Sequence, residues 1–272
     1  MNKKQEKSSD IKMILIFCLP FIVFMVFTFA EQNHQNPELQ NFTGHTFYPY
    51  IYITKILIVC LTMSHCLIYW LREFPFHFQK ISYWSFIAGI AGVVLWVGIS
   101  KLNLETKISH VFGIQTETPL DPAKNLVQNP SMTADAQKSQ TPHHTSRSAF
   151  NPFQAFRDSP VQAWLFFAFR MFGLALVVPL MEEFFLRGFL LRFVYDQNWT
   201  KISVGATSLA VWITVLIYSF THPEFFAAFV WFSLITFLVM RTKNIWDAVT
   251  AHFITNFLLG MYVLYTGEWY FM

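Results

Sequence analysis

Two adjacent glutamates lie in a stretch of the sequence that is otherwise apolar enough for a membrane. Glu182 and Glu183 belong to VVPLMEEFFLRGFLLRF, residues 177–193, and Arg187 follows shortly after them. In a helix, residues four apart share a face, whereas adjacent side chains project about 100° apart. We therefore expect Arg187 to neutralise Glu183 and to leave Glu182 facing another surface. Because a carboxylate within a bilayer costs at least a few kcal/mol, such a residue usually faces a protein interior and has a function there.

A simpler interpretation is that these charges mark the interfacial end of a span, where long side chains reach toward lipid headgroups. The apolar run continues past the glutamates, however, and includes Phe189 and Phe193. If Arg192 lies at the interface, Glu182 lies about ten residues deeper, roughly 15 Å along a helix. The stretch therefore favours a functional role for Glu182.

Three further polar residues are candidates for the same site. His252 and Asn256, in AHFITN, share one face of another apolar segment. His252 lies about nine residues from Lys243, roughly 14 Å along a helix, which is a depth similar to that of Glu182. His222, in SFTHPEFF, lies between two apolar segments. Taken alone, each histidine is more simply explained as a packing or turn residue.

Together these side chains suit hydrolysis by an activated water. A buried glutamate can serve as a general base, and histidine and asparagine can donate hydrogen bonds to a developing oxyanion. No nucleophilic serine is required. Two histidines and a glutamate also resemble catalytic zinc ligation, although the chain lacks the His-Glu-x-x-His signature. We expect no cofactor and keep a zinc-dependent intramembrane protease as an alternative.

The composition indicates that a polytopic membrane protein must position these residues. Of 272 residues, 54% are hydrophobic, 19% are aromatic and only 13% are charged, against about 25% charged in soluble domains. A spanning helix needs about 20 mostly apolar residues. The candidates are residues 11–29, 48–71, 81–99, 161–185, 203–220, 225–240 and 245–265. The predicted fold class is therefore an all-α membrane bundle with about seven to eight transmembrane helices.

The distribution of lysine and arginine predicts the orientation of the chain. The N-terminus contains Lys3, Lys4, Lys7 and Lys12, whereas the connection 31–47 contains neither residue type. The connections 72–80, 187–201 and 241–243 are basic again. Since positive residues favour the cytoplasmic side, we expect a cytoplasmic N-terminus in a multi-pass protein of a bacterial inner membrane. The basic residues form no patch that would indicate nucleic-acid binding.

One polar segment divides the chain. Residues 113–149 contain no aromatic residue and are rich in Pro, Ser, Thr, Gln and Asn, a composition that predicts a disordered insert. It separates an N-terminal three-span part, 1–112, from a C-terminal part, 150–272, which holds every candidate for chemistry.

The order of the motifs adds a resemblance. EEFFLR, then a histidine after the next span, then HFITN, resembles the CPBP (also called ABI) family of CAAX proteases and bacteriocin-processing enzymes, whose pattern is EExxxR, FxxxH, HxxxN. Members are regarded as glutamic intramembrane proteases and include the type II CAAX prenyl endopeptidases. The resemblance covers about residues 150–271. FNPF, THPEF and YVLYTGEWYF also resemble a bacterial CAAX protease-related branch, some of whose members accompany exosortase sorting systems.

The resemblance implies an endopeptidase acting on a membrane-anchored or lipid-modified protein. The implied site has a water-activating pair, an oxyanion pair and a pair that supports the site or contacts the substrate: Glu182 with His222, His252 with Asn256, and Glu183 with Arg187. A non-proteolytic membrane immunity or scaffold protein of the same fold is the alternative outside the enzymes. A transporter is less favoured, because no inverted repeat is visible.

Two features depart from the family pattern. Tyr218 stands where the pattern has phenylalanine. His222 lies about 21 residues after Lys201, roughly 31 Å along a straight helix, which would place it well away from the glutamates. We therefore expect a non-helical, interfacial or tilted start to the fifth span, or a different span count. Arg170, in the fourth span, is a further costly charge that could hold a substrate carboxylate or pair with a backbone group or another helix.

Overall fold

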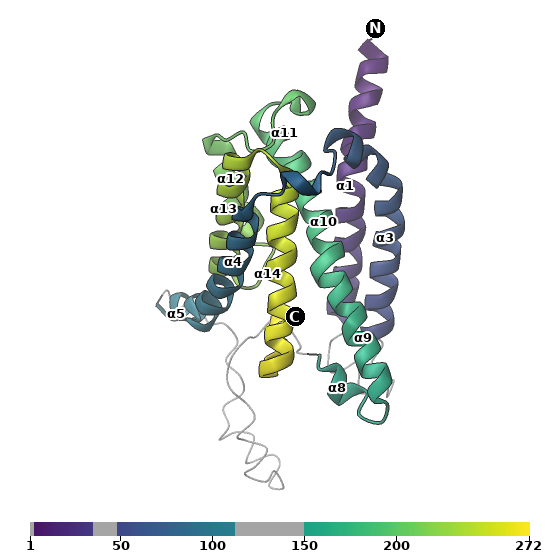
Figure 1. Cartoon of the computed structure of the whole chain (residues 1–272), viewed down its shortest axis with the longest axis vertical. Coiled ribbons are helices and arrows are strands. Elements are labelled where there is room, and N and C mark those ends of the chain that lie inside the picture. The colour runs from purple at the N-terminus through teal and green to yellow at the C-terminus, as the bar shows by residue number, and fades with distance from the viewer. Residues whose placement is uncertain (1–2, 35–47, 112–149) are drawn as a thin grey trace.

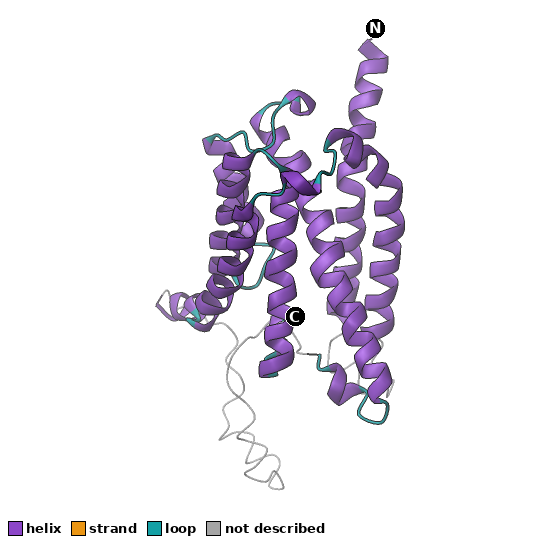
Figure 2. Ribbon diagram, viewed as in Figure 1, coloured by secondary structure: helices purple, strands orange, loops and turns teal. Residues whose placement is uncertain are grey.

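The described part of the protein is an all-α bundle. The computed structural model describes residues 3–34, 48–111 and 150–272, and these contain helices and connecting loops but no strand (Figures 1 and 2). The predicted insert, 113–149, lies outside the described residues. The predicted all-α polytopic fold is confirmed, whereas the division of the chain into an N-terminal and a C-terminal part stays a prediction.

The helices follow one another in the order that the apolar segments predicted. Before the insert lie α1 (Lys3–His34), α3 (Tyr48–Glu73), α4 (Tyr83–Lys101) and α5 (Leu104–Val111). After it lie α8 (Pro152–Ala155), α9 (Pro160–Phe172), α10 (Val178–Glu183), α11 (Leu191–Tyr195), α12 (Leu209–Ser219), α13 (Phe225–Thr242) and α14 (Ile245–Thr266). Two π-helical segments, η2 (Gly173–Val177) and η3 (Phe184–Leu190), join α9 to α11 through α10 without a break. Short 3₁₀ turns occur at η1 (Phe78–Lys80), η4 (Trp199–Lys201) and η5 (Trp269–Phe271).

Six of the described helices are long and apolar enough to cross a membrane. They are Ile11–Glu31, Tyr48–Glu73, Tyr83–Ile108, Pro160–Tyr195, Phe225–Thr242 and Ile245–Thr266. They correspond to six of the seven predicted spans. The remaining prediction, 203–220, placed the start of its helix too early, because helix α12 begins only at Leu209 and has 11 residues. Ser208 caps this helix by accepting a hydrogen bond from the Val211 N–H at 3.4 Å.

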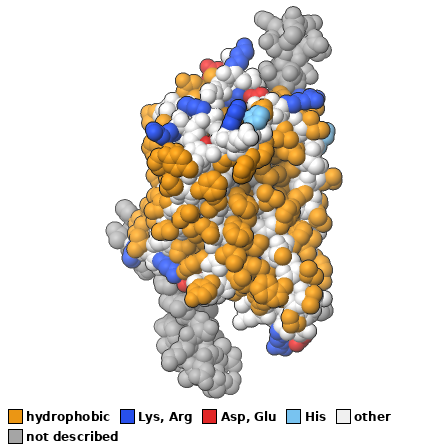
Figure 3. Space-filling view, viewed as in Figure 1, with side chains coloured by type: hydrophobic (Ala, Val, Ile, Leu, Met, Phe, Trp, Pro, Cys, Tyr) orange, Lys and Arg blue, Asp and Glu red, His pale blue; other side chains and the backbone are white. Residues whose placement is uncertain are grey.

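The surface agrees with a membrane environment. Apolar side chains cover the middle of the bundle, and most Lys, Arg, Asp and Glu side chains gather toward its two ends (Figure 3). Leu61, Val94 and Leu165 are large apolar residues that are 72%, 65% and 66% exposed. The protein is therefore an integral, multi-pass membrane protein. Helix α14 ends near the opposite end of the bundle from the start of α1 (Figure 1), but which end faces the cytoplasm stays a prediction.

Two packing arrangements fix the long helix that carries the glutamates. On one side, Phe17 of α1 and Trp70 of α3 pack on Phe184, and the Trp70 and Phe184 rings stack with centroids 4.5 Å apart. On the other side, α14 packs against α10 and α4 (Figure 1). A Cβ atom on Gly92 of α4 would lie 2.5 Å from Thr255 Oγ1, so this helix approaches α14 closely only because it has glycine there.

Candidate active site

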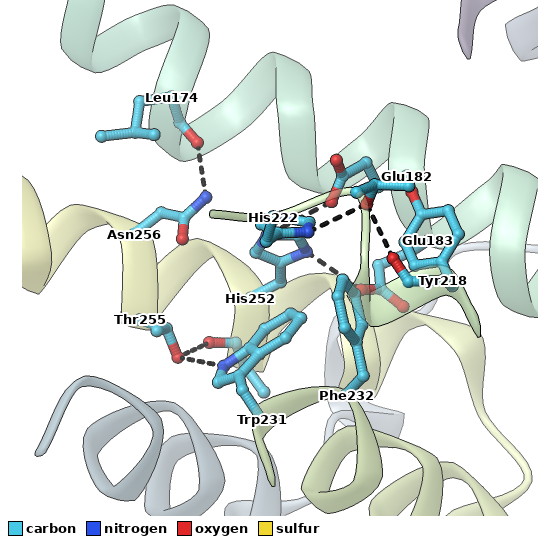
Figure 4. A network of polar contacts seen from close by, with 12 residues as sticks. Leu174, Glu182, Glu183, Tyr218, His222, Trp231, Phe232, His252, Thr255 and Asn256 are labelled. Atoms are coloured by element: carbon cyan, nitrogen blue, oxygen red, sulfur yellow. Dashed lines mark hydrogen bonds and ion pairs between the residues drawn. The ribbon is translucent and has the colours of Figure 1, made fainter. Parts of the chain in front are cut away.

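A cavity of about 520 Å³ opens among the helices. Its wall combines side chains from both sides of the insert, and Glu182, His222, His252 and Asn256 all contribute to it. These four residues come from three separate places in the chain: α10, the loop after α12, and α14. The four residues predicted to be catalytic are therefore brought to one cavity (Figure 4).

The two adjacent glutamates have different surroundings. Glu183 is fully buried, and both of its carboxylate oxygens accept from Arg187 Nη1 at 2.8 Å. Arg187 also donates from Nη2 to the Phe232 carbonyl at 3.1 Å. The ion pair predicted from the four-residue spacing is thus present. Glu182, which projects to the other side, lines the cavity and is 7% exposed.

His252 connects the two glutamates. Its Nδ1 lies 2.9 Å from Glu183 Oε1. Since Arg187 holds Glu183 as a carboxylate, Nδ1–H donates this hydrogen bond. That leaves Nε2 on the cavity side, 3.9 Å from Glu182 Oε2. This separation is too long for a direct hydrogen bond and suits one small group held between the two side chains. Glu183 therefore orients the imidazole toward Glu182.

Aromatic packing fixes the plane of this histidine. The Trp231 ring crosses the His252 ring at 62° with centroids 4.4 Å apart. The indole Nε1–H of Trp231 donates to Thr255 Oγ1 at 3.2 Å, and Thr255 donates to the Gly89 carbonyl at 2.9 Å. This chain of contacts ties α13, α14 and α4 together behind the imidazole. Sequence reasoning missed Trp231 and Thr255, although Thr255 lies one helical turn beyond Ala251 on the face that packs against α4.

His222 reaches the cavity because only part of the chain between Lys201 and it is helical. Residues 202–208 are irregular, and α12 is only about 16 Å long by its 11 residues. The estimate of about 31 Å from Lys201 applied only to a straight, continuous helix, and residues 202–208 provide the non-helical start that was expected instead. After α12, Pro223 prevents the helix from continuing, and His222 lies in the turn with its Nδ1 3.0 Å from Thr221 Oγ1. Its ring packs edge-on against Phe232 with centroids 5.2 Å apart.

Asn256 has a structural partner as well as a place in the cavity wall. Its Nδ2 donates to the Leu174 carbonyl at 2.9 Å. In the π-helical segment, the Val178 N–H bonds to the Gly173 carbonyl, five residues back. By the same spacing, the Leu174 carbonyl would be served by residue 179, which is a proline without an N–H. The Asn256 amide replaces that missing donor, and its second N–H remains for another acceptor.

Tyr218 stands where the family pattern has phenylalanine, and the structure shows the surroundings of its hydroxyl. Its side chain is 6% exposed and contributes to the cavity wall, between Phe21 and Phe232. The hydroxyl is enclosed and makes no hydrogen bond within the described residues. The aromatic ring keeps the packing role of the phenylalanine in the pattern, and the hydroxyl adds a buried polar atom.

The described donor atoms do not gather into a metal site. Among the residues that the structure describes, no group of three or more His, Cys, Asp and Glu side chains is arranged to hold a metal ion. The three cysteines, Cys18, Cys60 and Cys66, are all free thiols. None of the described groups therefore identifies a metal centre, and the prediction of no cofactor stays a prediction.

The comparisons with known proteins give one match, to part of the chain. Residues 163–258 match the family described as type II CAAX prenyl endopeptidase Rce1-like. The match includes Glu182, His222, His252 and Asn256 and leaves α1, α3 and α4 outside it. Neither the curated proteins nor the solved structures give a match to the chain.

Proposed function

We propose that the protein is an intramembrane glutamic endopeptidase that hydrolyses a peptide bond with water activated by Glu182, and the match of residues 163–258 to the type II CAAX prenyl endopeptidase Rce1-like family supports this proposal. The observation that carries this proposal is the arrangement of Glu182 and His252. Glu182 Oε2 faces His252 Nε2 at 3.9 Å in the wall of the cavity. The Glu183 carboxylate, in contrast, is already bonded to Arg187 and His252.

The geometry supports a single-step attack by water. A water between Glu182 Oε2 and His252 Nε2 would contact both. Glu182 accepts a proton from that water as its oxygen attacks the carbonyl carbon, and a tetrahedral oxyanion forms. Donors aimed at the oxyanion stabilise it, and the proton on Glu182 passes to the leaving amine. No acyl-enzyme forms, because the nucleophile is water.

The other cavity residues receive supporting roles in this proposal. We assign His222 to holding the attacking water together with Glu182. His252 and the second amide N–H of Asn256 are assigned to the oxyanion. Glu183 and Arg187 act through His252, whose tautomer they fix, a second layer of contacts of the kind that catalytic histidines commonly require.

The substrate proposed here is a membrane-anchored or lipid-modified protein. The cavity lies within helices that cross the membrane, so its substrate must reach it from the bilayer or its surface. A cooperation with an exosortase-type sorting system stays a prediction from the sequence alone. A non-proteolytic scaffold of the same fold remains the competing function, and it requires no chemistry from Glu182.

The test compares peptide ends in membranes from cells that make the wild-type protein or the Glu182→Gln variant. We expect at least one new peptide end in the wild-type membranes that is absent with Glu182→Gln. Asp158→Asn is the matched control, because the Asp158 side chain is 94% exposed and does not line the cavity; it should keep the wild-type pattern.

Identical peptide ends in both membranes, with both proteins present at equal levels, would refute hydrolysis and favour the scaffold. The zinc-dependent alternative is tested on the same peptide end. Full activity of metal-free purified protein excludes it, and loss of activity that only zinc restores would replace the glutamic mechanism.

A further inference from the structure

The cavity that holds Glu182 extends toward one end of the bundle. On α1, its lining residues run from Phe21 to Glu31, in the second half of that helix. On α3, which runs in the opposite direction, they lie between Tyr48 and Lys55, in the first third of the helix. The cavity therefore reaches from Glu182 toward the end of the bundle at which α1 ends and α3 begins, which we call the open end (Figure 1).

Charged side chains line the cavity near the open end. Lys55 pairs with Glu31 at 2.5 Å, and Arg170 of α9 donates to the Phe150 carbonyl at 3.0 Å. Glu31, Lys55 and Arg170 all contribute to the cavity wall. Charged side chains at membrane depth normally face protein or a water-filled space, because a charge in hydrocarbon is costly. This wall therefore suits water and peptide groups better than lipid chains.

Packed aromatic rings close the cavity at the other end of the bundle, the closed end. Trp70 of α3 stacks on Phe184 with centroids 4.5 Å apart, and Phe184 meets Trp246 of α14 edge-on at 5.4 Å. Phe17 of α1 and Phe74 contact the same Phe184 ring, at 6.4 Å and 5.9 Å. None of these aromatic residues lines the cavity. Because protein interiors are packed as densely as organic crystals, this aromatic layer separates the cavity from the end at which α1 begins.

The mouth of the cavity lies in the side of the bundle. Met25 of α1 and Phe220, which follows α12, both line the cavity and are 38% and 69% exposed. Thr221 and Pro223, in the same turn as Phe220, also line the cavity and are exposed. Met25 precedes Glu31 by less than two helical turns, so it lies roughly 9 Å along α1 from that residue. A membrane-anchored chain can therefore enter sideways, in the half of the membrane nearer the open end.

The basic residues indicate which end faces the cytoplasm. Those at the closed end belong to the start of α1 and to the ends of the helices that meet there: Lys3, Lys4, Lys7, Lys12, Arg72, Lys80, Arg192, Lys201, Arg241 and Lys243. At the open end, the connection 31–47 contains no Lys or Arg, and the longer segment 101–159 contains Lys101, Lys107, Lys124, Lys138, Arg147 and Arg157. Since positive residues favour the cytoplasmic side, we expect the closed end in the cytoplasm and the open end on the opposite side.

We propose that the cavity takes its substrate from the non-cytoplasmic side, and that this substrate is the non-cytoplasmic flank of a membrane-anchored protein. The side of entry follows from the cavity, the aromatic layer and the basic residues, whereas cleavage of the entering chain rests on the proposed function. Phe17, Trp70 and Phe74 come from α1 and α3, outside the residues that match the family. The N-terminal helices of this chain therefore contribute most of the closure toward the cytoplasm.

The experiment measures which face of the membrane gives a water-soluble reagent access to the cavity. The full-length chain carries Cys18→Ala, Cys60→Ala and Cys66→Ala, which remove the free native thiols, and one introduced cysteine. Val178→Cys is the cavity position, because Val178 is half-buried, lines the cavity and lies one helical turn before Glu182. The probe is a permanently charged methanethiosulfonate, which does not cross membranes and reacts with thiolates.

Three exposed positions serve as controls. Asp158→Cys reports the open end, Arg241→Cys reports the closed end, and Leu61→Cys, in the middle of α3, reports the lipid-facing surface. Each chain is probed in spheroplasts, where the reagent reaches only the non-cytoplasmic face, and in inside-out vesicles, where it reaches only the cytoplasmic face. We expect Val178→Cys and Asp158→Cys to be modified in spheroplasts and to lose this modification in vesicles. Arg241→Cys should show the reverse, and Leu61→Cys should resist the reagent in both.

Three results would overturn the proposal. Modification of Val178→Cys from the same face as Arg241→Cys would show that the cavity opens through the closed end. Modification of both Val178→Cys and Asp158→Cys in vesicles alone would show that the open end faces the cytoplasm. No modification of Val178→Cys from either face, in protein present at the wild-type level, would show that water does not enter the cavity. If Val178→Cys does not reach the membrane, Met25→Cys at the mouth gives the same three readings.

A second measurement tests the class of substrate. Peptide ends that are present with the wild-type protein and absent with Glu182→Gln are mapped onto the topology of the proteins that carry them. We expect these ends in the non-cytoplasmic flanks of membrane anchors, and ends confined to cytoplasmic segments would overturn the proposed substrate while leaving hydrolysis in place. No such end at all, with Val178→Cys modified in spheroplasts, would refute hydrolysis and support the side of entry.

Discussion

The adjacent glutamates should differ sharply when each is changed to glutamine. Glu183→Gln removes the charge that balances Arg187 and weakens three short contacts, two at 2.8 Å and one at 2.9 Å. Arg187 is 2% exposed and would stay buried without a counterion. Removing one partner of a buried pair costs about 3–5 kcal/mol. Among the described residues, Glu182 has no ion pair with an arginine and approaches His252 only to 3.9 Å, so we expect Glu182→Gln to cost less, below about 1 kcal/mol.

The free energy of unfolding is measured by SDS titration of the purified variants in mixed micelles. The proposed chemistry predicts the opposite order for activity: Glu182→Gln abolishes cleavage while remaining stable. Combining Glu183→Gln with Arg187→Met should restore much of the stability, because it removes the uncompensated charge. Equal losses for Glu182→Gln and Glu183→Gln, or a double variant as unstable as the sum of its single changes, would refute the assignment of different roles to the two glutamates.

Three further predictions concern the surroundings of the site. Gly92→Ala should lower the melting temperature, since its Cβ would meet α14, whereas Gly98→Ala, with nothing within 4 Å of its Cβ, should leave it unchanged or raise it. Asn256→Leu should cost about 1–3 kcal/mol in the SDS titration, because the Leu174 carbonyl loses its donor; an unchanged midpoint would contradict this. Tyr218→Phe should stabilise the protein by about 1 kcal/mol in the same assay, because it removes a buried hydroxyl that has no partner within the described residues. A loss of stability would show that the hydroxyl is bonded.

Local spacing made part of the site predictable. The ion pair of Glu183 and Arg187 follows from a four-residue separation, which brings two side chains together on any helix. The similar depths of Glu182 and His252 follow from counting residues to the nearest basic end, and their side chains approach to 3.9 Å. Both inferences need only the rise per residue of a helix that has no break between the residues counted.

The same arithmetic failed where the chain is irregular. The count from Lys201 to His222 gives no distance, because residues 202–208, apolar enough to be counted into a span, do not form a helix. The bond from Asn256 to the Leu174 carbonyl depends on a π-helical turn, and hydrophobic periodicity does not distinguish such a turn from an α-helix. Pro179 was the available signal, since a proline inside a helix always leaves one carbonyl without its donor.

The ion pair of Lys55 and Glu31 could not be predicted from the sequence for a different reason. The two residues lie on separate helices, 24 positions apart, and the spacing rules of a single helix do not join residues of two helices. In the sequence, Lys55 is a single charge within a long apolar run. Only the packing of the helices shows that its charge is neutralised by Glu31, near Arg170. The two ends of the cavity thus depend on different contacts. The end with Glu182 depends on short-range helical spacing, and the end with Arg170 depends on the packing of α1 on α3 and of α3 on α9. Lys55→Met removes one partner of this buried ion pair, so it should lower the free energy of unfolding in the SDS titration while leaving the 3.9 Å contact between Glu182 and His252 in place.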